Sequence, residues 1–345
     1  MKAFSIYGAA APAGGTAGVF LGGVLTEWAS WPWVFYVNVP IALIALALTP
    51  ALMPKAPARR GSVDLLGAAT ATAGLALTVF GIVRAPIEGW GSSATLLTIA
   101  GGLVLLAAFV AIEAVRREPL MRLSIFRTRA LPAANLAQLL LGAAWIPMWF
   151  FLNLYLQQVL GYGAFASGAA LLPMTVAIMV LMVVVAPRVI ARFGPKTPIV
   201  VGMLGLAAGM FGLSLARADG SFAVDVLPAS LLAATGMALA FIPSLGTAIS
   251  SAKPEEGGLA SGIVNTAYQV GSALGLAAMT AVATAHGADQ LGNVDALTNG
   301  YSAAFLGAGG IAVIGAVLAA VVLRVPKPAV VASVEPNDAP EAIAA

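Results

Sequence analysis

The chain has 345 residues, of which 60% are apolar and only 9% are charged. Soluble domains carry about 25% charged residues, so this composition excludes an ordinary water-soluble protein and predicts a membrane protein. The net charge of +3 is small and scattered, which argues against a nucleic-acid partner, and the lack of cysteine excludes disulfides and thiolate metal sites.

Apolar runs of roughly 20 residues recur along the whole chain, the length that crosses the ~30 Å hydrocarbon core of a bilayer as a helix. The short alternating strands of an outer-membrane barrel are absent from the pattern. The predicted fold class is therefore an all-α polytopic membrane protein with about ten transmembrane helices. The predicted segments are 3–25, 31–53, 64–83, 93–113, 132–160, 167–187, 198–216, 227–251, 257–285 and 302–323.

The basic residues give these segments an orientation. If Lys2 is cytoplasmic and the ten segments alternate, only Arg84 and Arg217 of the 17 basic residues lie outside. Cytoplasmic loops are enriched in Lys and Arg, so both termini are expected in the cytoplasm of a cell-membrane protein. The apolar start of the chain could also be a signal peptide, but it is rich in glycine and leads directly into another spanning segment.

Glycines recur every four residues in the first segment and leave one of its faces without side chains, so that a neighbouring helix can approach closely. This row consists of Gly14, Gly18 and Gly22, with Gly23 on an adjacent row. On spacing alone, ordinary packing between membrane helices is the favoured explanation of such a row.

The glycine row is followed by Leu25-Thr26-Glu27 and then by a Trp/Asn/Pro signature that contains Trp31, Asn38 and Pro40. Together these residues resemble the antiporter motif of the major facilitator superfamily, in its fourteen-helix drug:proton antiporter branch. Further matches occur in 155–162, 168–173 and 258–265. The resemblance implies a multidrug-efflux type of transporter, energised by a proton gradient, with no cofactor.

The resemblance also implies a division of the chain. Residues 1–53 correspond to the last two helices of an amino-terminal bundle, and 54–130 to two linker helices and a cytoplasmic loop. Residues 131–324 correspond to a six-helix carboxy-terminal bundle, and 325–345 to a disordered cytoplasmic tail. The family's first four helices are then missing, so the chain as given is expected to be incomplete or inactive.

Two departures from the family pattern stand out. Val19 follows Gly18 where the family usually has proline, which puts the usual helix bend in doubt. A cytoplasmic loop motif is recognisable in Arg192, Gly194 and Lys196, but Ala191 occupies the position of its usual acid. A charge lock between helix ends is therefore doubtful there.

Two polar stripes lie within the apolar helices. Trp145, Trp149, Asn153 and Gln157 are spaced by four and share one helix face, and Asn265 and Gln269 belong to a second stripe. Such surfaces could bind a flat lipophilic cation by stacking and cation–π attraction, with the amides orienting it. Alternatively, the same residues pack against neighbouring helices and hydrogen-bond across them.

Every acid falls at a helix end, in a loop or in the tail, and the only histidine, His286, follows a helix end. No proton relay is therefore visible, and neither catalytic nor metal-ligating residues are assigned. A membrane-embedded enzyme would need a nucleophile, base or metal cluster that the sequence does not show.

The sequence thus predicts a secondary transporter that exports small lipophilic or cationic substrates across the lipid bilayer. A non-transporting remnant or scaffold is the alternative. A channel is disfavoured because no ring of charges is visible, and the oligomeric state is left open.

Overall fold

The computed structural model describes residues 2–52, 64–116, 119, 121, 123–128 and 130–323, without the side chains of 2–13, 16, 127 and 254. The predicted tail 325–345 and most of the predicted loop after residue 53 lie outside these residues. All regular structure in the described part is helical. The helices are α1 (Lys2–Trp28), α2 (Trp33–Tyr36), α3 (Asn38–Leu52), α4 (Leu65–Glu88), α5 (Ser93–Val115), η1 (Leu123–Arg127), α6 (Ala130–Leu154), η2 (Tyr155–Val159), α7 (Ala164–Val180), η3 (Leu181–Val185), α8 (Ala186–Phe193), α9 (Lys196–Leu213), η4 (Phe222–Val226), α10 (Leu227–Ser250), η5 (Pro254–Glu256), α11 (Gly257–Ala285) and α12 (Val294–Val322).

Several of these helices join end to end, so that each of the ten predicted segments corresponds to one helical rod. Eight rods in the described part are long and apolar enough to cross a membrane. The rods outside this set are α1, whose first side chains are not described, and α11, in which glycine, hydroxyl and amide residues lower the hydropathy. The all-helical prediction is confirmed.

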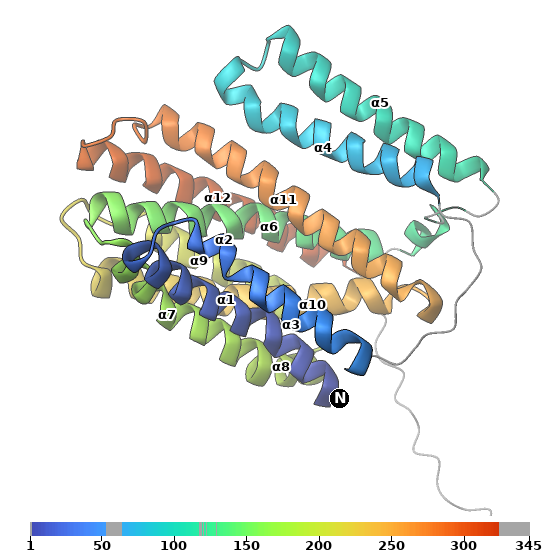
Figure 1. The fold of residues 1–345 in the computed structure, drawn as a ribbon, viewed down its shortest axis with the longest axis horizontal. Coiled ribbons are helices and arrows are strands. Elements are labelled where there is room, and N and C mark those ends of the chain that lie inside the picture. Colours follow the sequence, from blue (N-terminus) through green and yellow to red (C-terminus); the bar gives the residue numbers. More distant parts are fainter. Residues whose placement is uncertain are drawn as a thin grey trace, which may run out of the picture.

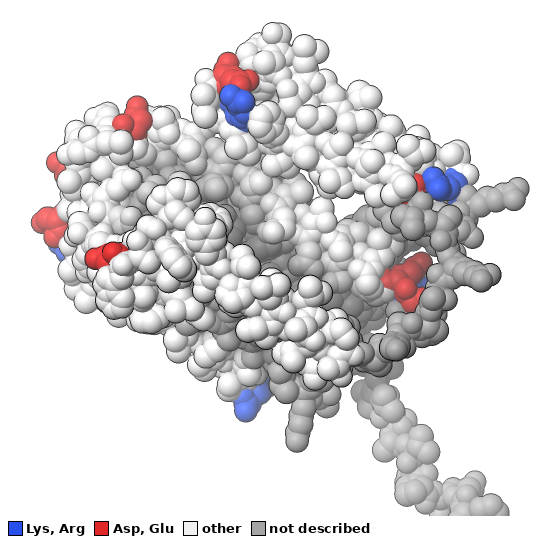
Figure 2. All heavy atoms as spheres, viewed as in Figure 1, with Lys and Arg blue, Asp and Glu red and all other residues white. Residues whose placement is uncertain are grey.

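Charged side chains lie at the two ends of the rods, and the broad face between them in Figure 2 is uncharged. Arg84 and Arg217 lie at one end, which we call the predicted outer end. The other basic residues whose side chains are described lie at the predicted cytoplasmic end and are Arg116, Arg188, Arg192, Lys196 and Lys253. Uncharged helix surface between two charged rims fits a protein whose middle lies in hydrocarbon.

Some predicted boundaries were wrong because polar residues form helical turns that hydropathy misses. The last helix begins at Val294, not 302, because the Asn293 side chain accepts a hydrogen bond of 3.1 Å from the Ala296 N–H and caps it. Asp225, predicted in a loop, belongs to the π-helical turn η4, which leads into α10.

Close helix packing depends on glycines that face backbone. In α11, a Cβ added to Gly271 would overlap the carbonyl oxygen of Leu139 in α6, and one added to Gly275 would overlap that of Ala143. A Cβ on Gly202 of α9 would lie 2.6 Å from the backbone nitrogen of Ala240 in α10. These helices therefore touch backbone to backbone, as membrane helices with small interface residues do.

The rods from α6 to α12 form one bundle around a buried core, with α6 and α9 at its centre. The α4–α5 pair is an antiparallel hairpin beside α11 along one edge of this bundle (Figure 1). On another side α1 packs against α7, while every residue of α3 is exposed. The predicted division of the chain into bundles stays a prediction.

The glycine contacts predict that Gly271→Val destabilises the protein by about 1–3 kcal/mol, because the added side chain must push α11 away from α6. Gly262→Val is the matched control, since a Cβ at Gly262 of the same helix meets nothing within 4 Å. The thermal unfolding midpoint of the purified protein in detergent measures both. Equal midpoints for the two variants would contradict the packing described here.

Candidate functional site

The aromatic stripe predicted on α6 does not form one uniform face. Trp145 is 5% exposed and belongs to the core, Trp149 is half-buried, and Gln157 is exposed. The two indole rings meet edge to face, with centroids 6.1 Å apart. Pro147 and the π-helical turn η2 interrupt the regular α-helical register between the first and last members. The stripe therefore runs from the interior to the surface of the bundle.

The amides at the end of this stripe form a small network. Asn153 accepts hydrogen bonds at its Oδ1 from the Gln157 side chain, at 3.0 Å, and from the Ser167 hydroxyl of α7, at 2.6 Å. The network ties the end of α6 to the first turn of α7. Part of the stripe thus serves packing, while Trp149 and Gln157 remain partly open.

The second stripe, on α11, is exposed. Asn265 donates a hydrogen bond of 2.9 Å to the Ser261 carbonyl oxygen of its own helix, and Gln269 lies exposed one turn further on. Tyr268, beside them, meets Phe241 of α10 edge to face at 5.5 Å. The role of both stripes in substrate binding stays a prediction.

The sequence interpretation missed several buried polar side chains, among them Gln138. Gln138 of α6 is 1% exposed and donates hydrogen bonds of 3.0 Å to the Phe241 carbonyl oxygen and to the Ser244 hydroxyl, both in α10. Its carbonyl oxygen has no hydrogen-bond partner among the described residues. An amide within an apolar helix is itself the signal that could have identified it.

Most of the predicted glycine row faces open space. A Cβ added to Gly14, Gly18 or Gly22 would meet nothing within 4 Å. A Cβ at Gly23 would lie 2.9 Å from the carbonyl oxygen of Ala164 at the start of α7, and a Cβ at Gly168 of α7 would lie 3.0 Å from the carbonyl oxygen of Val19. In the described part of α1, the close approach to α7 thus uses residues beside the predicted row and not the row itself.

Near the predicted outer end, side chains of α1 contact the first turn of α7. The Glu27 carboxylate accepts a hydrogen bond of 3.1 Å from the backbone N–H of Phe165, one of the unsatisfied donors at a helix start. The Phe165 ring stacks on Trp28 with centroids 5.6 Å apart and meets Phe20 edge to face at 5.9 Å. This contact joins the segment with the antiporter-like motif to the larger bundle.

The remaining motif residues lie at helix ends. Asn38 begins α3 and donates a hydrogen bond of 3.0 Å to the Val34 carbonyl oxygen, with Pro40 in the first turn that follows. Arg192 is in the last turn of α8, Gly194 has a φ of +72° that turns the chain, and Lys196 begins α9. No ion pair joins Arg192 or Lys196 to a described acid, in line with Ala191 at the position of the usual acid.

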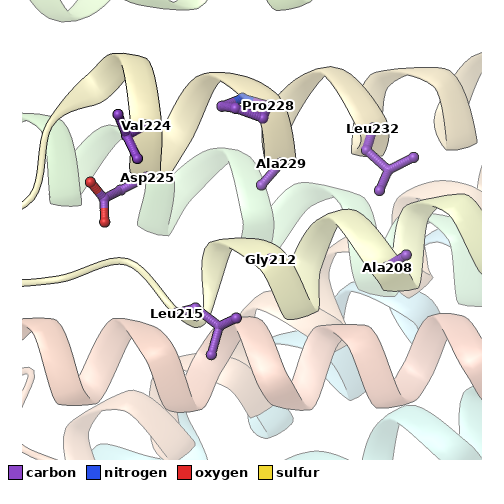
Figure 3. A pocket seen from close by; sticks show the side chains of 8 residues that line it. All are labelled: Ala208, Gly212, Leu215, Val224, Asp225, Pro228, Ala229 and Leu232. Atoms are coloured by element: carbon purple, nitrogen blue, oxygen red, sulfur yellow. The ribbon is translucent and has the colours of Figure 1, made fainter.

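A groove of about 380 Å³ lies at the predicted outer end, between α9 and α10. Its lining includes Gly212, Leu215, Ala229 and the Asp225 side chain (Figure 3), and none of the predicted site residues. Arg217 beside it donates to Asp225 at 3.0 Å, a hydrogen bond that raises the pKa of the guanidinium above its ordinary value. The groove is therefore a separate feature of the surface.

Comparison with known proteins identifies the class of protein that this fold and these motifs define. A family profile described as Major Facilitator Superfamily matches residues 1–276. The chain belongs to the Major Facilitator Superfamily of membrane transporters, which confirms the resemblance drawn from the motifs.

The relatives are exporters and resistance proteins. A cephamycin export protein of Amycolatopsis lactamdurans is 37% identical over 89% of this chain and 63% of its own length. A puromycin resistance protein of Streptomyces alboniger is 34% identical over 93% of this chain and 66% of its own length. A tetracenomycin C resistance and export protein of Streptomyces glaucescens is 35% identical, over 80% and 52%. The chain thus spans less than two thirds of the length of these relatives.

The contacts between α1 and α7 are expected to contribute measurably to the stability of the protein. Phe165→Ala removes two aromatic contacts, worth about 0.5–1.5 kcal/mol each beyond the buried area, and should lower the thermal unfolding midpoint by several degrees. Phe150→Ala is the control, because Phe150 is exposed and meets only its neighbour Phe151 among the described aromatic pairs. If the two variants unfold at the same temperature, α1 is not held by this contact.

Proposed function

We propose that the chain belongs to a proton-coupled exporter of amphipathic small molecules, which works by alternating access. The observation that supports this proposal is the similarity of the chain to proteins named for antibiotic export and resistance. In transporters of this architecture the substrate binds near the bilayer midplane, between repeat-related bundles. The helices α6 and α11 carry the predicted substrate residues on one such bundle.

Within this proposal, Trp149 on α6, Gln157 on η2, and Asn265 and Gln269 on α11 contact the substrate. Their partial or full exposure supports this assignment, because a buried side chain needs rearrangement before it can touch a ligand. An indole face attracts a lipophilic cation, while amides both donate and accept hydrogen bonds. Trp145, which is buried, would act by supporting the Trp149 ring edge to face.

Energy would come from the proton gradient, which the resemblance to drug:proton antiporters implies. The relatives extend well beyond the length of this chain. The acids that couple proton entry to export are therefore not assigned to residues of this chain.

A non-transporting scaffold is the second candidate. It is favoured by the open face of α1 at Gly14, Gly18 and Gly22 and by the complete exposure of α3, which leave apolar surface for another membrane helix to cover. The test is whether the 345-residue chain, reconstituted in liposomes, moves a cationic dye when a proton gradient is applied. Dye movement would rule out the scaffold, and its absence beside a transporting control protein would favour it.

The substrate assignment predicts that Trp149→Ala lowers the initial rate of dye export about tenfold, the equivalent of about 1.4 kcal/mol, in a form of the protein that transports. Trp90→Ala is the matched control, because Trp90 is exposed in the turn between α4 and α5. Dye export that is unchanged in Trp149→Ala would remove this residue from the substrate site.

The predicted orientation, with both termini in the cytoplasm, is tested by single cysteines, because the natural chain has none. We expect a membrane-impermeant maleimide on intact cells to label Gly91→Cys in the α4–α5 turn, and to label Lys253→Cys before α11 only after the cells are permeabilised. Both positions are exposed. The opposite labelling pattern would reverse the orientation.

A further inference from the structure

Two acidic side chains are buried together at the predicted cytoplasmic end of the α4–α5 hairpin. Asp64 is the residue that caps α4 and is 3% exposed, and Glu113, in the last turn of α5, is 4% exposed. Burying a carboxylate costs several kcal/mol unless charges or hydrogen bonds compensate it. The substrate assignment above does not use either residue.

One oxygen of each carboxyl group is fully used. The Asp64 Oδ1 accepts a hydrogen bond from the Gly67 N–H, at 2.8 Å, and forms an ion pair with Nη1 of Arg116, at 2.9 Å. The Glu113 Oε2 accepts a hydrogen bond of 2.7 Å from the backbone N–H of Met121. These contacts fix how both side chains lie.

The other two oxygens converge on one point and have no hydrogen-bond partner among the described residues. Asp64 Oδ2 and Glu113 Oε1 are both buried, and neither has a hydrogen-bond partner in the described part of the chain. They lie 2.8 Å and 2.6 Å from the single point that a Cβ atom on Gly67 would occupy. Glycine at 67 thus leaves open the space on which the two oxygens converge.

Among the side chains that the structure describes, the charges at this site do not balance. Two ionised carboxylates lie beside the single guanidinium of Arg116, which leaves one buried negative charge that no other described cation pairs with. A metal ion would need further ligands, because calcium and magnesium take six or more oxygen ligands and only two free oxygens converge here. The described residues also contain no group of three or more His, Cys, Asp or Glu side chains able to hold a metal. A proton needs only the two oxygens that are free, and facing carboxyl groups share one readily.

We propose that Asp64 and Glu113 bind one proton between them, which makes the end of the α4–α5 hairpin a proton-binding site. The proton joins Oδ2 to Oε1 and, with Arg116, neutralises the cluster. Raising the pH removes this proton, leaves two carboxylates facing one another and loosens the end of the hairpin. The proposal concerns the hairpin alone and goes beyond the proposed export function, so its test does not require transport.

Few other charged side chains lie near this site in the described part of the chain. Along α11, which packs against α4, the only titratable side chain is Tyr268, and Lys253, Glu255 and Glu256 precede that helix. The remaining charged pair of the hairpin, Arg84 with Glu88 at 2.8 Å, lies at its opposite end. Glu88 therefore offers a matched control, an acid on the same helix as the Asp64 cap but outside the site.

The test is infrared spectroscopy of the purified full chain across a pH titration. In the wild type we expect a band from a protonated carboxyl group that shifts in D₂O and disappears as the pH rises. Glu113→Gln should abolish this band, because an amide at position 113 cannot share a proton with Asp64 as a second carboxyl group does, while Glu88→Gln should leave it intact. Absence of the band in the wild type at every pH would overturn the proposal, as would its persistence in Glu113→Gln.

A second variant tests the geometry. Gly67→Ala places a methyl group between the two oxygens, so the band should be lost or shifted although both acids remain. An unchanged band in Gly67→Ala would show that the oxygens do not share a proton across this space. A band that responds to added sodium or calcium ions at constant pH would instead assign a metal cation to the site and would also overturn the proposal.

Discussion

The constraint on which the structure depends is that a hydrocarbon solvent offers no hydrogen bonds. Backbone groups must therefore be satisfied within helices, and attraction between helices must come from close packing rather than from exclusion of water. The contacts of Gly271 with Leu139 and of Gly202 with Ala240 show how this chain meets that demand. Where backbones touch, dispersion contacts and short interhelical hydrogen bonds, such as that from Gln138 to α10, take the place of a conventional core.

The same constraint explains which polar residues lie inside. Gln138, Asn153 and Ser167 are tolerated because their hydrogen bonds join one helix to another. Asp64 and Glu113 are tolerated beside Arg116 and a helix start, where donors are available. The three described ion pairs all lie at rod ends, where side chains can reach the polar region of a bilayer.

Hydropathy was sufficient to predict where the helices are, because a spanning helix needs a long apolar run whatever it packs against. It was not sufficient for boundaries that depend on single hydrogen bonds, such as the cap of Asn293 on α12. Nor could it show that Gly14 faces open space while Gly23 meets α7, since both glycines have the same local sequence character.

Asp64 and Glu113 were correctly placed at helix ends, but 49 residues of chain separate them, and only the hairpin fold brings them together. For the candidate substrate site, the sequence predicted that Trp145 and Trp149 share one helix face, but not that the proline and the π-helical turn would carry the stripe from interior to surface.

The α4–α5 hairpin has one more consequence, for the order in which the chain folds during synthesis. Its two helices are joined by the short turn from Gly89 to Ser92 and make most of their contacts with one another. Contacts between segments close in sequence form early, because little chain entropy is lost in closing the loop. The hairpin can therefore pair inside the membrane while the ribosome is still translating α6, and α11 later docks against a surface that is already complete.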